Sequence, residues 1–95
     1  MVACDYFITI YIEGKIEEQE FLKQHFYGEV NGSSIRSINN EVIEKRGEWD
    51  LIKQTFITQF QGETLEEVDQ YAHEYAHEYF PPVRPNIEHN AQRID

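Results

Sequence analysis

Apolar and polar residues alternate over residues 5–13, which predicts a β-strand. One side of this strand carries Tyr6 and three isoleucines, and the other side carries Phe7 and Tyr11. Aromatic and β-branched residues fit the pleated surface of a sheet well. Because both sides are largely apolar, we expect an interior strand.

The spacing of apolar residues changes to that of a helix between residues 16 and 27. Phe21, Leu22 and Phe26 fall on one side of a helix. Three glutamates crowd its first turn, where the helix dipole favours negative charge. Gly28 follows at the position where a glycine commonly ends a helix. We therefore predict a first helix over residues 16–27.

Two further strands are predicted in the middle of the chain. Residues 35–45 form the first, with a bend or bulge expected at Asn39 and Asn40. Residues 45–48 supply a hairpin turn, and residues 49–60 form the strand that follows it.

A second helix is predicted from Thr64 to Phe80. Thr64 and Glu67 form the T-x-x-E pattern of a capping box at its start. Prolines at 81 and 82 stop it, because proline cannot continue the helical hydrogen bonds. The last stretch, residues 83–95, is polar without a period and is expected to be an irregular tail.

The order of predicted elements is β-α-β-β-α, which describes a single α+β domain over residues 1–82. We expect a small antiparallel or mixed sheet with two helices on one face. The order resembles a ferredoxin-like unit without its last strand. A three-stranded sheet leaves exposed edges, so a homodimer formed through a sheet edge is an open expectation.

The chain is strongly acidic, and its charge narrows the classes of partner. Its 95 residues hold 8 Lys and Arg against 18 Asp and Glu, a formal net charge of −10. Binding to nucleic acid depends on cations that neutralise phosphates, so direct nucleic-acid binding is not expected. An anionic membrane surface is disfavoured for the same reason.

The cysteine count and the N-terminal residues suggest a compartment. Cys4 is the only cysteine, so no intramolecular disulfide can form and a disulfide-stapled secreted scaffold is excluded. The apolar run at residues 6–12 is too short for a signal peptide or a membrane span. We expect a cytoplasmic protein, of a cell or of an infected host.

The second helix contains an H-E-x-x-H pattern, His73-Glu74-Tyr75-Ala76-His77. These five residues resemble the zinc-binding motif of the zincin metallopeptidases. The resemblance implies that His73 and His77 are zinc ligands and that Glu74 is the general base. A third ligand would have to come from Glu88 or His89 in the tail.

A simpler origin of the pattern is a tandem repeat of Tyr-Ala-His-Glu over residues 71–78. On a helical projection His73 and His77 lie on the flank or outer side of the helix, away from its apolar face. We therefore expect a solvated helical face and no cofactor. Weak zinc or nickel binding by the pair, and a metal-dependent hydrolase, are the alternatives.

The second helix also concentrates the negative charge. Residues 54–83 hold six carboxylates and no Lys or Arg, together with three tyrosines. Tyrosines are favoured at protein interfaces, and acidic surfaces attract basic ones. The pattern predicts a protein-binding module without enzymatic activity, and solubility alone is the alternative role of the charge.

We expect a stoichiometric inhibitor of the immunity, antitoxin or phage anti-defence type. It would occupy a basic surface of a nucleic-acid-handling enzyme. The expected contact residues are Glu66, Glu67, Asp69, Tyr71, Glu74, Tyr75, Glu78 and Tyr79.

Overall fold

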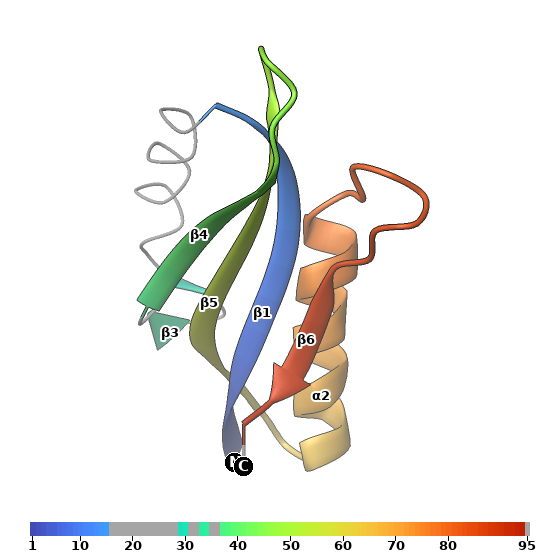
Figure 1. Ribbon diagram of the computed structural model, residues 1–95. Helices are drawn as coiled ribbons and strands as arrows, with labels where there is room; N and C mark the ends of the chain where they lie inside the picture. Colours follow the sequence, from blue (N-terminus) through green and yellow to red (C-terminus); the bar gives the residue numbers. More distant parts are fainter. Residues whose placement is uncertain (16–28, 31–32, 35–36, 95) are drawn as a thin grey trace.

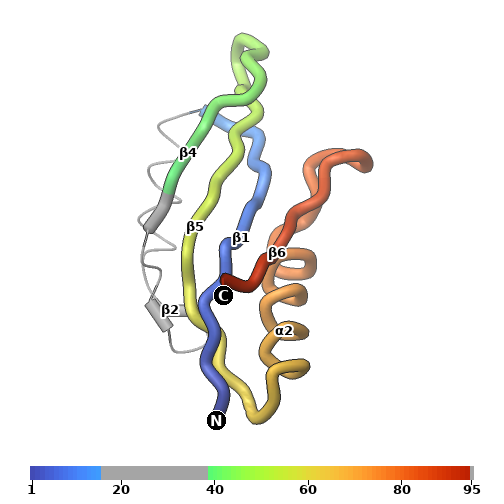
Figure 2. The backbone as a smooth tube through the Cα atoms, turned by 60° about the horizontal axis from the view of Figure 1, so that its bottom comes forward, coloured from blue at the N-terminus to red at the C-terminus, as the bar shows by residue number. Residues whose placement is uncertain are grey.

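The fold is built on a four-stranded antiparallel sheet in the order β4-β5-β1-β6 (Figures 1 and 2). The computed structural model describes residues 1–15, 29–30, 33–34 and 37–94. Within the sheet the strands are β1 (Val2–Gly14), β4 (Ser37–Glu44), β5 (Asp50–Gly62) and β6 (Asn90–Arg93). Two short strands, β2 (Glu29–Val30) and β3 (Ser33–Ser34), pair separately with each other.

The long strands β1 and β5 pair over their whole length, from Val2 opposite Gly62 to Gly14 opposite Asp50. Residues that lie opposite each other in an antiparallel pair point to the same side of the sheet. The register therefore places the buried isoleucines of β1 beside Phe56 on the same face. The alternation predicted for residues 5–13 and 49–60 is confirmed.

The edge strand β4 pairs with β5 and carries a local irregularity. The register shifts between Val42 and Glu44, so the bulge lies at this end of the strand and not at Asn39 and Asn40 as predicted. Asn40 instead accepts a hydrogen bond from the buried Gln54 side chain of β5, with Nε2 3.0 Å from Oδ1. This bond ties the edge strand to the interior one.

One helical segment covers one face of the sheet, α2 (Leu65–Glu74) continuing directly as the π-helical turn η1 (Tyr75–Tyr79). Thr64 caps its start, because its hydroxyl accepts from the Glu67 backbone N–H at 3.2 Å. Phe80 adopts an extended conformation, and the first of the two prolines follows. The capping pattern and the proline stop are confirmed.

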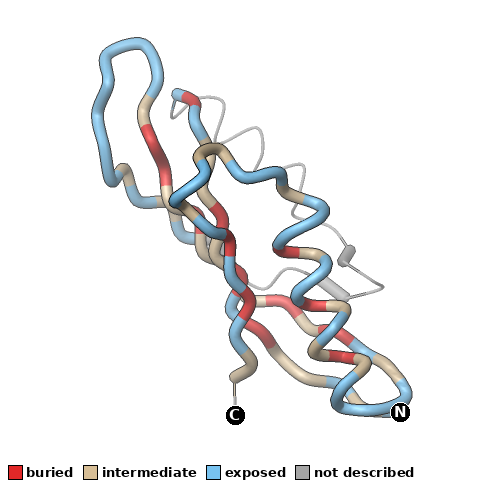
Figure 3. Tube along the Cα trace, turned by 90° about the vertical axis from the view of Figure 1, so that its right-hand side faces the viewer, coloured by how far each residue is buried: buried red, intermediate tan, exposed pale blue. Residues whose placement is uncertain are grey.

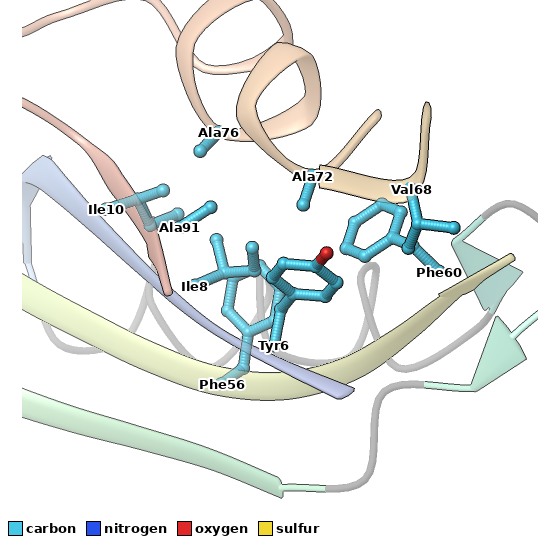
Figure 4. Close-up of a cluster of buried hydrophobic side chains, with 9 residues drawn as sticks. All are labelled: Tyr6, Ile8, Ile10, Phe56, Phe60, Val68, Ala72, Ala76 and Ala91. Carbon is cyan, nitrogen blue, oxygen red and sulfur yellow. The ribbon is translucent and has the colours of Figure 1, made fainter. Parts of the chain in front are cut away.

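Small residues on the inner side of the helix bring it close to the sheet. Val68, Ala72 and Ala76 are fully buried at a spacing of four residues. Figure 4 shows them over the core side chains of the sheet, with Val68 beside Phe60 and Ala76 over Ile10 and Ala91. Figure 3 shows the buried positions of the helix on its inner side and the exposed ones outside. The small inner residues therefore leave room for large aromatic rings from the sheet.

The predicted β-α-β-β-α arrangement with two helices on one face is wrong. The described residues form a mostly β structure with one helical segment of 15 residues and a four-stranded antiparallel sheet. The helix predicted over residues 16–27 lies outside the described residues.

The strand β6 was missed because its own sequence gives no signal. Residues 90–93 read Asn-Ala-Gln-Arg, and only Ala91 turns a buried apolar side chain to the core. The strand forms because β1 offers a free edge, with Tyr6 to Thr9 opposite Arg93 to Asn90. Part of the expected irregular tail is thus an edge of the sheet.

His89 anchors the chain just before β6. Its Nδ1 accepts from the Tyr11 backbone N–H at 3.1 Å, and its Nε2 lies 3.0 Å from the carbonyl oxygen of Pro81. The ring is buried and stacks on Tyr11. A neutral imidazole with its proton on Nε2 satisfies both bonds. The ring therefore joins β1 to the loop that leaves the helix.

The loop between the helix and β6 also reaches the β4–β5 hairpin. Arg84 contacts Glu13 at 3.3 Å and Glu44 at 3.2 Å. Arg46 in the hairpin turn pairs with the same two carboxylates, at 3.8 Å and 2.8 Å. The four side chains form a network that fixes this loop against the far end of the sheet.

Replacing Ala72 by leucine should destabilise the protein by about 1–3 kcal/mol, because the contact has no room for a larger side chain. Urea unfolding followed by circular dichroism measures the change. Gln70→Leu is the matched control, since Gln70 is exposed on the same helix. A loss of stability that is equal in the two variants would contradict the close contact.

Replacing His89 by alanine should cost about 1–3 kcal/mol, because the Tyr11 N–H loses its acceptor in a buried place. Hydrogen exchange at the Tyr11 amide should accelerate in this variant. Glu88→Ala, at the exposed neighbouring position, is the control. Unchanged protection of Tyr11 in His89→Ala would rule out the anchoring role.

Candidate functional site

The candidate site is the outer surface of α2 and η1. The eight residues expected to contact a partner all lie on this helical segment, but they divide into two groups. Glu66, Glu74, Glu78 and Tyr79 are exposed. The other four are half-buried and take part in contacts within the molecule: Glu67, Asp69, Tyr71 and Tyr75.

Glu67 completes the start of the helix. Its carboxylate accepts from the Glu63 backbone N–H at 3.1 Å and from the Tyr71 hydroxyl. The bond from Tyr71 is the main reason that the pKa of Glu67 lies below its usual value. The same bond raises the pKa of Tyr71. This pair therefore stabilises the first two turns and engages both carboxylate oxygens of Glu67 in contacts within the molecule.

Asp69 connects the helix to two strands. Its carboxylate accepts from the Tyr6 hydroxyl of β1, and the Arg93 guanidinium of β6 lies 3.3 Å from its Oδ2. Burial, followed by the hydrogen bond to Asp69, raises the pKa of Tyr6 above its usual range. Sequence reasoning missed Tyr6 and Arg93 as partners, because nothing local relates positions so far apart in the chain.

Tyr75 belongs to an aromatic cluster at the end of the helix. Its ring meets those of Phe56 and Phe60 edge-on, at centroid distances of 6.2 Å and 5.6 Å. On the solvent side Tyr79 stacks on it, with centroids 5.1 Å apart and ring planes 16° from parallel. Burial raises the pKa of Tyr75. Tyr79 itself is 61% exposed, so this stack passes from the core to the surface.

A surface pocket of about 350 Å³ opens on this side of the helix. Its lining consists of Tyr71, Glu74, Tyr75, Glu78 and Tyr79. All five belong to the predicted contact set, so the fold brings together three tyrosines and two carboxylates from two successive turns. None of the five lining residues is basic. Part of the wall is formed by η1. π-Helical turns are rare in proteins as a whole, and those that occur lie frequently at functional sites.

The H-E-x-x-H residues lie on the outer side of the helical segment. The His73 and His77 side chains are exposed and their rings stack, with centroids 6.1 Å apart. His89, one of the two suggested third ligands, is buried against β1 with both ring nitrogens engaged. No group of three metal-ligating side chains converges among the residues that the structure describes. Within the described ranges, the motif thus provides a pair of histidines without a third ligand beside it.

A larger pocket, of about 610 Å³, lies at the β4–β5 hairpin and was not anticipated. Its lining includes Glu13, Arg46, Glu48 and Trp49. Trp49 is 47% exposed, which is unusual for so large an apolar side chain. The carboxylate of Glu13 is already paired with Arg46 and Arg84. The net charge of this pocket is therefore smaller than that of the helical one.

In alkaline solution, we expect Tyr6 and Tyr75 to ionise later than an ordinary tyrosine, because the folded state holds their pKa values above the usual one. The unfolded chain ionises them near pH 10. Their contribution to stability is therefore complete below about pH 10 and declines as the pH rises further. Ultraviolet absorbance of tyrosinate measures the titration.

The variants Tyr6→Phe and Tyr75→Phe should each remove one late-titrating group from the native curve. The protein unfolded in urea, in which the six tyrosines titrate together, is the control. A titration curve of the native protein that coincides with that of the unfolded protein would contradict the burial of the Tyr6 and Tyr75 side chains.

Within the part of the chain that the structure describes, no helix combines the length and apolar character that crossing a membrane requires. Comparison with protein-family models, with curated proteins and with solved structures found no match.

Proposed function

We propose that this protein works by binding a protein partner that has a basic surface, and that the outer side of α2 and η1 is the contact. The observation that supports this proposal most is the composition of the pocket. Its five lining residues are three tyrosines and two glutamates, and none of the five is basic. Tyrosine is enriched among the residues that dominate binding energy. A carboxylate beside it selects partners of positive charge.

The charge of the whole chain favours the same kind of partner. A net charge of −10 steers the molecule toward a basic surface over a distance of several ångströms and speeds association at low salt. The helical segment concentrates this charge, because residues 54–83 carry six carboxylates and no Lys or Arg of their own, and Arg93 of β6 pairs with one of the six, Asp69.

Enzymes that handle nucleic acid present such basic surfaces, since they neutralise phosphates. A small acidic domain seated in that groove would exclude the nucleic acid by occupying its place. This is the action of a stoichiometric inhibitor, as in immunity proteins, antitoxins and phage anti-defence proteins. Binding of this kind requires no catalytic group on the chain.

The decisive experiment is affinity capture from an extract of the source organism, with the tagged protein and two charge variants. Glu74→Gln with Glu78→Gln removes two charges from the pocket, and Glu48→Gln with Glu88→Gln removes two exposed charges elsewhere. We expect the parent and the second variant to retain one basic protein in equimolar amount. The pocket variant should bind it about tenfold more weakly, because each exposed charge pair contributes up to about 1 kcal/mol.

The retained protein should elute as salt is raised, and added DNA or RNA should displace it if the contact is a nucleic-acid groove. Equal retention by the two double variants would contradict the proposed surface. Elution that is indifferent to salt would contradict the charge-based mode of binding.

A further inference from the structure

The pocket that three tyrosines and two glutamates of the helical segment line has a specific chemical composition. Its walls are aromatic rings, and its polar groups are carboxylates. Aromatic faces attract cations because their π-electrons are negative, and carboxylates accept hydrogen bonds from cationic donors. A ligand that uses both kinds of group must carry positive charge and N–H donors.

Contacts within the molecule already use some of the lining groups. The Tyr71 hydroxyl donates to Glu67, and one oxygen of Glu74 accepts from Gln70 at 2.9 Å. Tyr75 has its ring against the core phenylalanines. The Tyr79 ring also contacts Tyr75 and Phe80, yet 61% of this residue is exposed, and Glu74 and Glu78 are exposed beside it.

The stacking of Tyr79 on Tyr75 restricts where a ligand can lie. Insertion of a planar group between two rings requires about 7 Å, twice the carbon contact distance of about 3.5 Å. The two centroids are 5.1 Å apart, so nothing enters between them. A planar ligand must therefore cover the exposed surface of Tyr79. Of the two glutamates in the lining, Glu74 precedes Tyr79 by about one turn of helix and Glu78 is its neighbour in the chain.

We propose that this pocket receives a single arginine side chain of the partner, a proposal that rests on the function proposed above. The guanidinium stacks on Tyr79 and donates N–H bonds to Glu74 and Glu78. Arginine suits this arrangement better than lysine, because its guanidinium is planar, weakly hydrated and forked. The pocket volume of about 350 Å³ accommodates one such side chain and its stem.

The test uses three short peptides, acetyl-Gly-Xaa-Gly-amide with arginine, lysine or citrulline at Xaa. Citrulline keeps the planar shape and lacks the charge. Each peptide is titrated into the folded protein at low salt, and NMR follows the backbone amides and the tyrosine rings. We expect saturable shifts confined to residues 74–79 for the arginine peptide, binding about threefold weaker for lysine, and no saturable shift for citrulline.

Variants separate the ring from the carboxylates. Tyr79→Leu should weaken the arginine peptide about two- to fivefold, the range expected for an exposed cation–π contact. Tyr79→Phe retains the ring face and should bind as the parent does. Glu78→Gln should weaken binding about threefold, while Glu48→Gln, at the hairpin, should leave it unchanged.

Shifts spread over the acidic surface without saturation, or equal affinities for the arginine and citrulline peptides, would overturn the proposal. So would an unchanged affinity in Tyr79→Leu. The peptide experiment needs no partner, so its failure is distinguishable from failure of the proposed function. A captured partner with no peptide binding would refute the arginine site alone.

Discussion

The contact between the small inner residues of the helix and the aromatic residues of the sheet determines what the protein presents to solvent. Val68, Ala72 and Ala76 fill the inner side, so the helix lies close to the sheet, and the rings of Tyr6, Phe56 and Phe60 belong to the core beneath it. The inner side of the helix therefore carries small side chains at these three positions. The tyrosines consequently stand at its borders, where each ring has one part against the core and another near water. The candidate site is thus a by-product of how the core is packed.

Elements that depend on local patterns were predictable, and those that depend on distant partners were not. A few neighbouring residues suffice to recognise the alternation in β1 and β5, the threonine cap and the proline stop. The polar strand β6 exists only because β1 offers it hydrogen bonds. The sequence gives no signal of the change from α-helix to π-helix either, since Tyr75–Tyr79 has the composition of an ordinary helix.

The same division applies to the candidate site. Helical spacing sufficed to place the glutamates and tyrosines on one segment, and all five pocket residues came from that set. It could not separate residues that hold the fold from residues that face outward. Asp69 is held by Tyr6 and Arg93, and Leu65, an apolar residue in the first turn of the helix, is 43% exposed. Only the position of the strands beside the helix decides these cases.

The ion pairs of Arg84 give the acidic character of the protein a second effect. The loop after the helix is held to Glu13 and Glu44 by partly exposed charges, which dissolved ions screen. Raising the ionic strength therefore relaxes the loop that begins one residue after η1, at the same time as it weakens attraction to a basic partner. The salt dependence of folding stability therefore includes these internal ion pairs, whereas the salt dependence of binding reports only the charges whose surroundings change when the complex forms. Salt thus acts on this protein in two separate ways, and measuring the free energy of unfolding and the dissociation constant over the same range of salt distinguishes them.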